Sequence, residues 1–250
     1  MDNSLHRSGG RAFDEQRPVK ILPDYLDFAE GSALIEVGRT RVVAAATLED
    51  RVPPFLKNTG SGWVTSEYAM LPRSTEKRTT RERMQGGRSQ EIQRLIGRSL
   101  RAVMDLPVLG ERQVIVDCDV IQADGGTRAA SITAACIALA LCLKRMIDER
   151  ILDRMPLKHL VAAVSVGVVA GELLLDLDYE EDSSAELDMN LVQTDRGQLV
   201  EVQASAEKSP FSRKTLAGLM QLADKGLAEL FQKQREVLIK KSRLFMAYGA

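Results

Sequence analysis

The sequence predicts an α/β protein, in the broad sense that includes α+β folds, made of two packed halves of similar βαβα-type plan. Strand-like segments come first, followed by a helix, a strand and a second helix, and then by strands and a helix again. No Pro- or Ser-rich linker separates the halves, so we expect them to share an interface. The 250 residues, 44% hydrophobic and 28% charged, can bury a sizeable core, which excludes a wholly disordered or collagen-like chain.

Each predicted strand and helix of the first half rests on a pattern of its own in the sequence. Short apolar runs flank a Gly38 turn and predict a hairpin, and Pro72 ends a further strand-like run. Apolar residues at helical intervals predict an amphipathic helix, and alternation predicts a strand with Asp117 and Asp119 on one face. The predicted elements are strands over 33–37, 42–47 and 63–71, a helix over 89–104 and a strand over 114–121.

The second helix and the second half follow the same logic. The segment 127–150 is apolar nearly all round, which indicates a buried helix. Gly171-Glu172 and Asp195-Arg196-Gly197 interrupt apolar runs and predict two hairpins, and Ser212 is a suitable N-cap for the last helix. These predictions place strands over 160–170, 173–177, 191–194 and 199–203, and a largely helical segment over 212–248.

The chain ends and the apolar runs predict a cytoplasmic protein without membrane contact. Residues 1–16 are polar and lack the apolar stretch of a signal peptide, so we expect a flexible arm there and a single domain over 17–250. The most apolar run, 129–143, has about 15 residues, whereas a membrane span needs roughly 20.

Cysteine and histidine usage argues against two classes of site. Cys118, Cys136 and Cys142 are an odd number and form no C-x-x-C pair, so neither a disulfide framework nor a cysteine zinc site is expected. His6 and His159 lie in unrelated segments, which disfavours a histidine-rich metal site.

Charge is strongly segregated although the formal net charge is only −1. The segment 72–101 holds nine basic and three acidic residues, whereas 172–188 holds eight acidic residues and no basic one. Clustered positive charge favours binding of a polyanion. Two solvated charged faces are the other interpretation.

The run Asp124-Gly125-Gly126-Thr127-Arg128 lies between a predicted strand and the buried helix. Two glycines let the backbone approach a ligand, and Thr127 can cap the helix, where free N–H groups favour an anion. Arg128 can add a bidentate contact to a phosphate. The run matches neither the P-loop nor the dinucleotide fingerprint, and a plain Gly-Gly turn remains the alternative.

The acidic run over 179–190 contains carboxylates suited to a divalent cation or to general acid catalysis. In one straight strand Asp182 and Asp188 would lie roughly 20 Å apart. They can share a site only if Ser183 and Ser184 turn the chain back. An acidic surface turn is the other interpretation.

Six stretches of the sequence occur uninterrupted and in the order typical of one known family: 30–32, 49–56, 70–73, 91–101, 117–128 and 179–190. Through them the chain resembles, over nearly its whole length, the ribonuclease PH family, the phosphorolytic tRNA 3′-end nucleotidyltransferases.

The resemblance implies the ribonuclease PH fold and a hexameric ring built as a trimer of dimers. It implies removal of 3′ nucleotides from tRNA precursors and other RNA 3′ ends by inorganic phosphate, with nucleoside diphosphates as products, and nucleotide addition as the reverse reaction. The family's phosphate contacts fall on Arg88, Gly126, Thr127 and Arg128, and its acidic pair, associated with Mg²⁺, falls on Asp182 and Asp188. Its RNA contacts fall on Arg73, Lys77, Arg78 and Arg81.

The chain departs from the family pattern at a few positions. Ala129, Ala134, Ala204 and Lys208 replace usual residues, and the loop between Arg81 and Arg88 is about three residues short. These changes bear on substrate grip and rate. A non-catalytic RNA-binding subunit of an exosome-like ring is the alternative function, but the survival of both arginines and both aspartates favours an enzyme.

Overall fold

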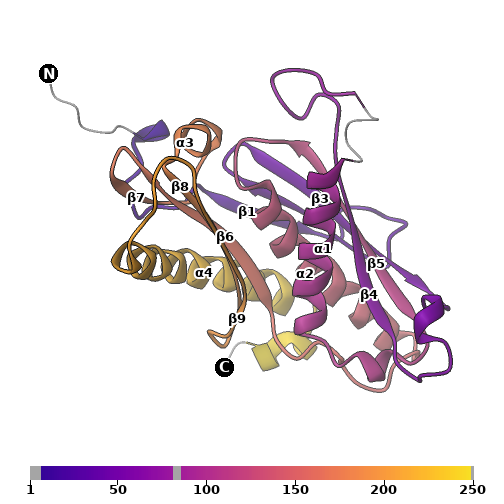
Figure 1. Ribbon diagram of the computed structural model, residues 1–250. Helices are drawn as coiled ribbons and strands as arrows, with labels where there is room; N and C mark the ends of the chain where they lie inside the picture. The colour runs from indigo at the N-terminus through magenta and orange to yellow at the C-terminus, as the bar shows by residue number, and fades with distance from the viewer. Residues whose placement is uncertain (1–6, 81–85, 249–250) are drawn as a thin grey trace, which may run out of the picture.

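The computed structural model describes residues 7–80 and 86–248 and contains two β-sheets (Figure 1). The first sheet has five strands in the order β1-β2-β3-β5-β4. β4 and β5 run parallel, because helix α1 crosses between them, and the other neighbours are antiparallel. The bounds are β1 Val19–Pro23, β2 Gly31–Val37, β3 Thr40–Glu49, β4 Trp63–Met70, α1 Gly87–Ala102 and β5 Gln113–Gln122.

The second sheet has four antiparallel strands in the order β7-β6-β8-β9. A short helix, α3, lies between β7 and β8. The bounds are β6 Val161–Val169, β7 Glu172–Leu175, α3 Tyr179–Ser184, β8 Leu187–Thr194 and β9 Leu199–Ala206.

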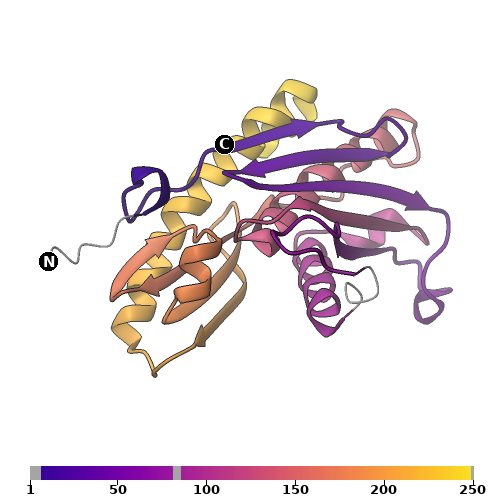
Figure 2. The ribbon, with the colours of Figure 1, turned by 90° about the horizontal axis from the view of Figure 1, so that it is seen from above.

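Two long helices hold the sheets together. α2 (Thr127–Asp148) packs on β2 and β3 and also on β6, so it lies between the sheets. α4 (Arg213–Lys241) packs on β6 and β7 and reaches β1, and Figure 2 shows it running alongside both halves. Short 3₁₀ segments occur at Ser8–Gly10, Pro54–Leu56, Leu106–Leu109 and Arg243–Tyr248.

Helix α2 is the centre of the core. An unbroken run from Ala129 to Leu143 is buried, as the all-round apolar pattern predicts. Within the described ranges it is the one helix long and apolar enough to suit a membrane span, but 83% of its most apolar window is buried inside the protein. That burial is typical of a core helix.

Most predicted elements are confirmed, and in β5 Val116 and Cys118 are buried whereas Asp117 and Asp119 lie on the opposite face. Two elements were not predicted with bounds of their own. β1 begins directly after Pro18 and ends at Pro23, and these prolines hid its bounds because proline is also typical of loops. α3 forms within the acidic run. The halves also differ in plan, because the described second sheet has no parallel pair.

The prediction of a flexible arm over 1–16 is wrong for its described part, 7–16; residues 1–6 lie outside the described residues. Arg7 is only 5% exposed. Its Nε donates to Glu181 Oε1 at 2.8 Å, and its Nη2 donates to the Leu175 carbonyl at 2.7 Å. The polar composition of the segment suggested exposure to solvent. Its packing was not predicted because the acidic partner of Arg7 lies 174 residues further along the chain.

Candidate active site

The Gly-Gly turn lies at the N-terminal end of α2. Gly125 and Gly126 have φ values of 75° and 66°, a left-handed conformation that glycine adopts without steric cost. Gly126 is the N-cap residue, and it has no side chain with which to cap the amides of the first turn. Those N–H groups therefore face outward as donors for an anion.

Thr127 does not cap the helix, which corrects the sequence-based expectation. It lies inside the first turn, and its Oγ1 is 2.9 Å from the hydroxyl oxygen of Tyr68 in β4. Burial raises the pKa of Tyr68, so its hydroxyl stays protonated at neutral pH. This contact links the turn to the first sheet.

Arg128 follows in the first turn of α2. Its Nη1 donates to Gln203 Oε1 at 2.8 Å, and Gln203 Nε2 donates to Glu91 Oε1 at 3.0 Å. This chain of side chains joins α2 to β9 and α1, so the Arg128 guanidinium is held in position. Arg88 is exposed in the first turn of α1.

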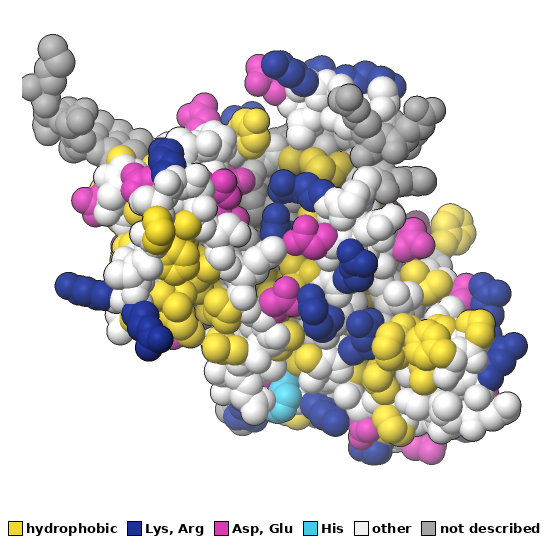
Figure 3. Space-filling model, in the orientation of Figure 1, with side chains coloured by type: hydrophobic (Ala, Val, Ile, Leu, Met, Phe, Trp, Pro, Cys, Tyr) yellow, Lys and Arg dark blue, Asp and Glu magenta, His cyan; other side chains and the backbone are white. Residues whose placement is uncertain are grey.

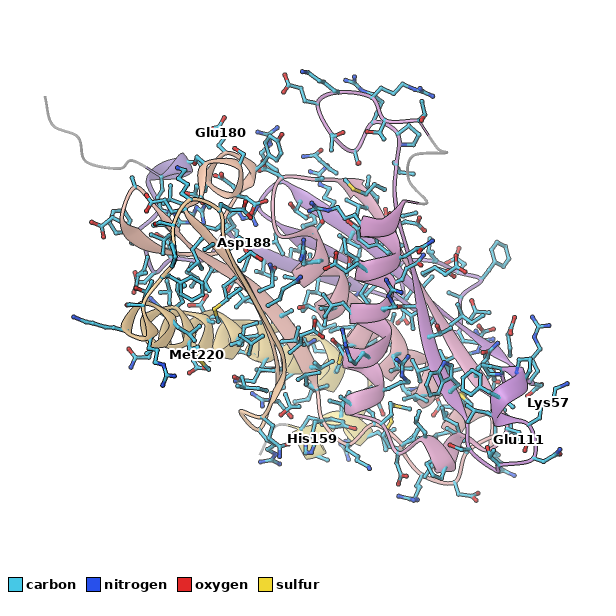
Figure 4. All side chains as sticks on the ribbon, in the orientation of Figure 1. Lys57, Glu111, His159, Glu180, Asp188 and Met220 are labelled. Atoms are coloured by element: carbon cyan, nitrogen blue, oxygen red, sulfur yellow. The ribbon has the colours of Figure 1, made fainter. Side chains whose placement is uncertain are left out.

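The acidic residues approach these arginines from the second half. Asp182 lies in α3, and Asp188 lies in β8, where its backbone pairs with Gly167 and Ser205. α3 ends at Ser184 and the chain turns before β8, so the two aspartates come together as the shared-site hypothesis required. In the view of Figure 4, Asp188 lies between the second sheet and α1.

Electrostatics show that the four charged groups form one cluster. Burial, followed by the negative charge of Asp182, raises the pKa of Asp188 from 3.8 to about 6. The positive charges of Arg128 and Arg88 oppose that rise. The same two arginines oppose the rise in the pKa of Asp182, which burial causes.

Asn190 also belongs to this cluster. It lies two residues after Asp188 on the same face of β8, and its Nδ2 donates to Asp188 Oδ2 at 3.2 Å. This hydrogen bond stabilises the ionised carboxylate and orients it.

Figure 3 shows acidic and basic side chains interspersed down the middle of the molecular surface, over α1 and β9.

Helix α3 is fixed by its own cap and by the N-terminal segment. Asp178 accepts a hydrogen bond from the Glu181 backbone at 3.0 Å, and the Glu181 side chain accepts one from the Asp178 backbone, which makes a capping box. Arg11 Nη2 lies 3.2 Å from Glu181 Oε2, and Arg7 pairs with the same carboxylate. Asp182 is therefore carried by a short but well-anchored helix.

The predicted RNA-binding residues lie on the loop after β4, which projects beyond the end of α1 (Figure 1). Arg73, Lys77 and Arg78 are exposed, whereas Arg81 lies outside the described residues. The carbonyl of Ser74 accepts a hydrogen bond of 2.8 Å from the backbone of Ala123, directly before the Gly-Gly turn. The base of the basic loop therefore adjoins the candidate anion site.

Sequence reasoning missed several residues that support the cluster. Tyr68 and Gln203 lie in strands of ordinary composition, and only the folded register brings them to the site. Asn190 ends the acidic run over 179–190, but its contact with Asp188 was not predicted. Arg7 and Arg11 were assigned to a flexible arm. Both arginines lie far from the acidic run in the sequence, so no local pattern predicted that they contact it.

Two models of one protein family match this chain. The model of domain 1 of the 3′ exoribonuclease family (RNase_PH) matches residues 15–144, and the model of domain 2 (RNase_PH_C) matches residues 159–226. The chain is 57% identical to ribonuclease PH of Moorella thermoacetica, covering 93% of this chain and 94% of that protein. It is 55% identical to ribonuclease PH of Dehalococcoides mccartyi strain BAV1, covering 93% and 98%.

Solved structures resemble the fold. An Archaeoglobus fulgidus exosome with RNA bound to the active site matches with a TM-score of 0.80 at 25% identity, covering 93% of each chain. Rice Rrp46 matches with a TM-score of 0.74 at 23% identity, covering 93% of this chain and 100% of that one.

Proposed function

The chain belongs to the ribonuclease PH family of 3′ exoribonucleases, and from that premise we propose that Arg88, residues 126–128, Asp182 and Asp188 form its active site. The protein is a phosphorolytic 3′–5′ exoribonuclease, that is, a nucleotidyltransferase that acts on RNA and assembles into oligomers. We further propose tRNA precursors as its substrates and a hexamer, a trimer of dimers, as its assembly.

One observation carries the site assignment: two arginines and two aspartates from four separate elements interact within one cluster beside the open N-terminus of α2. Inorganic phosphate is a small anion that needs donors and positive charge. Arg88, Arg128 and the first-turn amides supply both. Two phosphate groups would otherwise repel one another, so this positive field also lowers the cost of bringing phosphate up to the RNA backbone.

The reaction is a displacement at phosphorus. An oxygen of inorganic phosphate forms a bond to the phosphorus of the last phosphodiester, and the bond from that phosphorus to the 3′ oxygen of the preceding nucleotide breaks. The terminal nucleotide leaves as a nucleoside diphosphate, and the shortened RNA keeps its 3′ oxygen, which takes up a proton. Asp188 can take one of two roles here: with a pKa near 6 in the metal-free site it can hold and deliver that proton near neutral pH, or, once ionised, it can act as a ligand for a cation.

We propose Mg²⁺ as the cation of this site. Asp182 and Asp188 offer carboxylate oxygens, the ligand type that Mg²⁺ prefers. Burial and then the charge of Asp182 raise the pKa of Asp188, and a cation would relieve the repulsion between the two carboxylates. Across the described ranges, no group of three or more Asp, Glu, His or Cys side chains is arranged to hold a metal. Two carboxylates plus substrate phosphates are a common way of holding Mg²⁺. When bound, the ion would neutralise charge on the reacting phosphates.

The test is a phosphate-dependence assay on a tRNA with a short 3′ trailer. Shortening should require added phosphate and release nucleoside diphosphates. Equal shortening without phosphate, with monophosphate products, would contradict phosphorolysis. RNA binding without any turnover in phosphate and magnesium would instead identify a non-catalytic ring subunit.

Asp188→Asn tests the site within the same assay. Loss of the ionisable carboxyl group should lower kcat by at least about 100-fold while RNA binding and folding persist. Asp153→Asn is the matched control, because Asp153 is exposed beyond the far end of α2, about 30 Å from the Gly-Gly turn along the helix axis. Equal activity of the two variants would remove Asp188 from the mechanism.

A further inference from the structure

Arg17, directly before β1, is a buried arginine at the junction of the two halves, and it lies outside the groups assigned above. It is only 6% exposed. Its Nε and Nη2 donate to the two carboxylate oxygens of Asp176 at 2.8 and 2.6 Å, a bidentate pair. Its Nη1 donates to the carbonyl of Asp124, and its Nη2 lies 3.3 Å from the carbonyl of Leu177.

These partners belong to opposite sides of the active site. Asp124 opens the Gly-Gly turn that precedes α2, whereas Asp176 and Leu177 lead into α3, which carries Asp182. One guanidinium group therefore ties the turn of the proposed phosphate site to the segment that carries the acids. A buried arginine fork is rigid, because each donor is held by its own acceptor.

The two segments are packed closely against each other. A Cβ atom at Gly125 would lie 2.4 Å from the carbonyl oxygen of Leu177, and one at Gly126 would lie 3.2 Å from Nη2 of Arg17. The two backbones are thus already in van der Waals contact. Because the segments pack this closely, the Arg17 contacts help to set how one segment lies against the other.

Thr40, at the start of β3, holds the turn from the opposite side. It is fully buried, and its Oγ1 accepts a 2.9 Å hydrogen bond from the Asp124 N–H and donates a 2.7 Å hydrogen bond to the Gly125 carbonyl. The Gly-Gly turn is therefore held on one side by Thr40 of β3 and on the other by Arg17, whose guanidinium group also binds Asp176 of the second half.

We propose that Arg17, assisted by Thr40, is a positioning residue for phosphorolysis: it fixes the Gly-Gly turn against the acid-bearing segment and so sets where phosphate lies relative to Asp182 and Asp188. The inference rests on the proposed phosphate site. Because misplacement of a reacting group by about 1 Å can cost about 100-fold in rate, a tie at this junction controls turnover without touching substrate.

The first test compares Arg17→Lys with wild type. Lysine keeps the positive charge beside Asp176 but cannot reach Asp176, Asp124 and Leu177 at once, since it is a single point donor. We expect kcat to fall about 10- to 100-fold and the KM for phosphate to rise several-fold, with the KM for RNA unchanged within twofold. Lys225→Gln is the control, because it breaks an exposed 2.6 Å pair with Asp14 in the same N-terminal segment and should leave all three constants unchanged.

A merely structural role would lower the melting temperature and the active fraction, but it would leave the phosphate KM of the folded enzyme unchanged. Arg17→Lys that is folded and keeps kcat and phosphate KM within twofold of wild type would overturn the proposal.

Thr40 keeps the proposal testable if Arg17→Lys does not fold. Thr40→Val removes both hydrogen bonds to the turn at nearly constant volume and should raise the phosphate KM, and Thr40→Ser, which restores the hydroxyl group, should return it to the wild-type value. If Val and Ser variants have the same phosphate KM, the positioning role is wrong. Failure of the proposed function itself is distinguishable, because the wild-type enzyme would then show no phosphate-dependent release of diphosphates.

Discussion

Asp188 holds the most strongly perturbed carboxyl group of the candidate site. Its pKa is raised from 3.8 to about 6 by burial and by Asp182. Between these values the folded protein binds more protons at this position than the unfolded chain, so the free energy of unfolding falls as the pH rises through that interval. The ionised carboxylate is therefore a cost to stability above pH 6, of about 3 kcal/mol at most.

Asp188→Asn should consequently stabilise the metal-free protein. We expect the variant to exceed wild type by about 1–3 kcal/mol at pH 8, with the difference shrinking as the pH falls toward 4. Denaturant unfolding in a chelator at several pH values measures this, with Asp153→Asn as the control. A stability difference that does not depend on pH would contradict the raised pKa.

Gly125 packs directly against the backbone of Leu177 in the second half. Gly125→Ala forces a Cβ to 2.4 Å from the Leu177 oxygen at a φ of 75°, so we expect a loss of at least about 2 kcal/mol of unfolding free energy. Gly197→Ala is the matched control: its φ is 77°, but a Cβ there would meet nothing within 4 Å, and only the backbone strain of about 1 kcal/mol remains. Equal losses in the two variants, measured by denaturant unfolding, would show that the contact with Leu177 is unimportant.

The charged groups of the candidate site could be predicted from the sequence better than the residues that hold those groups in place. Arg128 and Asp188 stand in motifs whose residue types suggest chemistry. Gln203 and Arg17 act through hydrogen bonds to residues far away in the sequence, and such partners are set by strand register and by the docking of the N-terminal segment. No local pattern encodes those distances.

At the scale of elements, periodicity predicted most helices and strands to within a few residues. It succeeded for α1 and α2 because their apolar residues follow helical spacing or fill a whole helix. It failed for α3, because a six-residue helix made of Tyr, Glu, Asp and Ser buries little apolar surface and is formed by its capping box and by Arg7. Such a helix depends on tertiary partners more than on its own composition.

The basic loop after β4 is the element for which RNA binding makes a separate prediction. Replacing Arg73, Lys77 and Arg78 by Gln in one triple variant should raise the KM for RNA. It should also make the fall of log affinity with log salt concentration shallower, by about 2 in slope. The KM for phosphate should stay constant, since these three exposed side chains are not among the groups of the proposed phosphate site.

A triple variant on α4 provides the control for this loop. Lys214, Lys233 and Lys240 are exposed on that helix, and their replacement by Gln removes the same charge elsewhere. If both triple variants weaken RNA binding equally, the effect is one of net charge and the loop has no specific role.

At the scale of the whole molecule, the described surface carries large apolar side chains that a monomer would leave in water. Phe28, between β1 and β2, is fully exposed, and Phe55 and Met246 are 66% and 59% exposed. Exposed aromatic and Met side chains are typical of contact surfaces between subunits.

Sedimentation tests the proposed hexamer. Six copies of a 27.6 kDa chain give about 166 kDa, and we expect a single species near that mass at assay concentration. A stable monomer that retains full activity would contradict it.

The position of α2 between the sheets has a consequence for how substrate comes and goes. Because its residues belong to the cores of both halves, and Arg17 bridges the junction at its N-terminal end, we expect the halves to move together instead of hinging apart. Phosphate and the RNA terminus must therefore thread into a site that is already assembled. Release of each diphosphate then depends on exchange of ligand contacts with water, so successive rounds of trimming can follow one another without a slow domain movement between them.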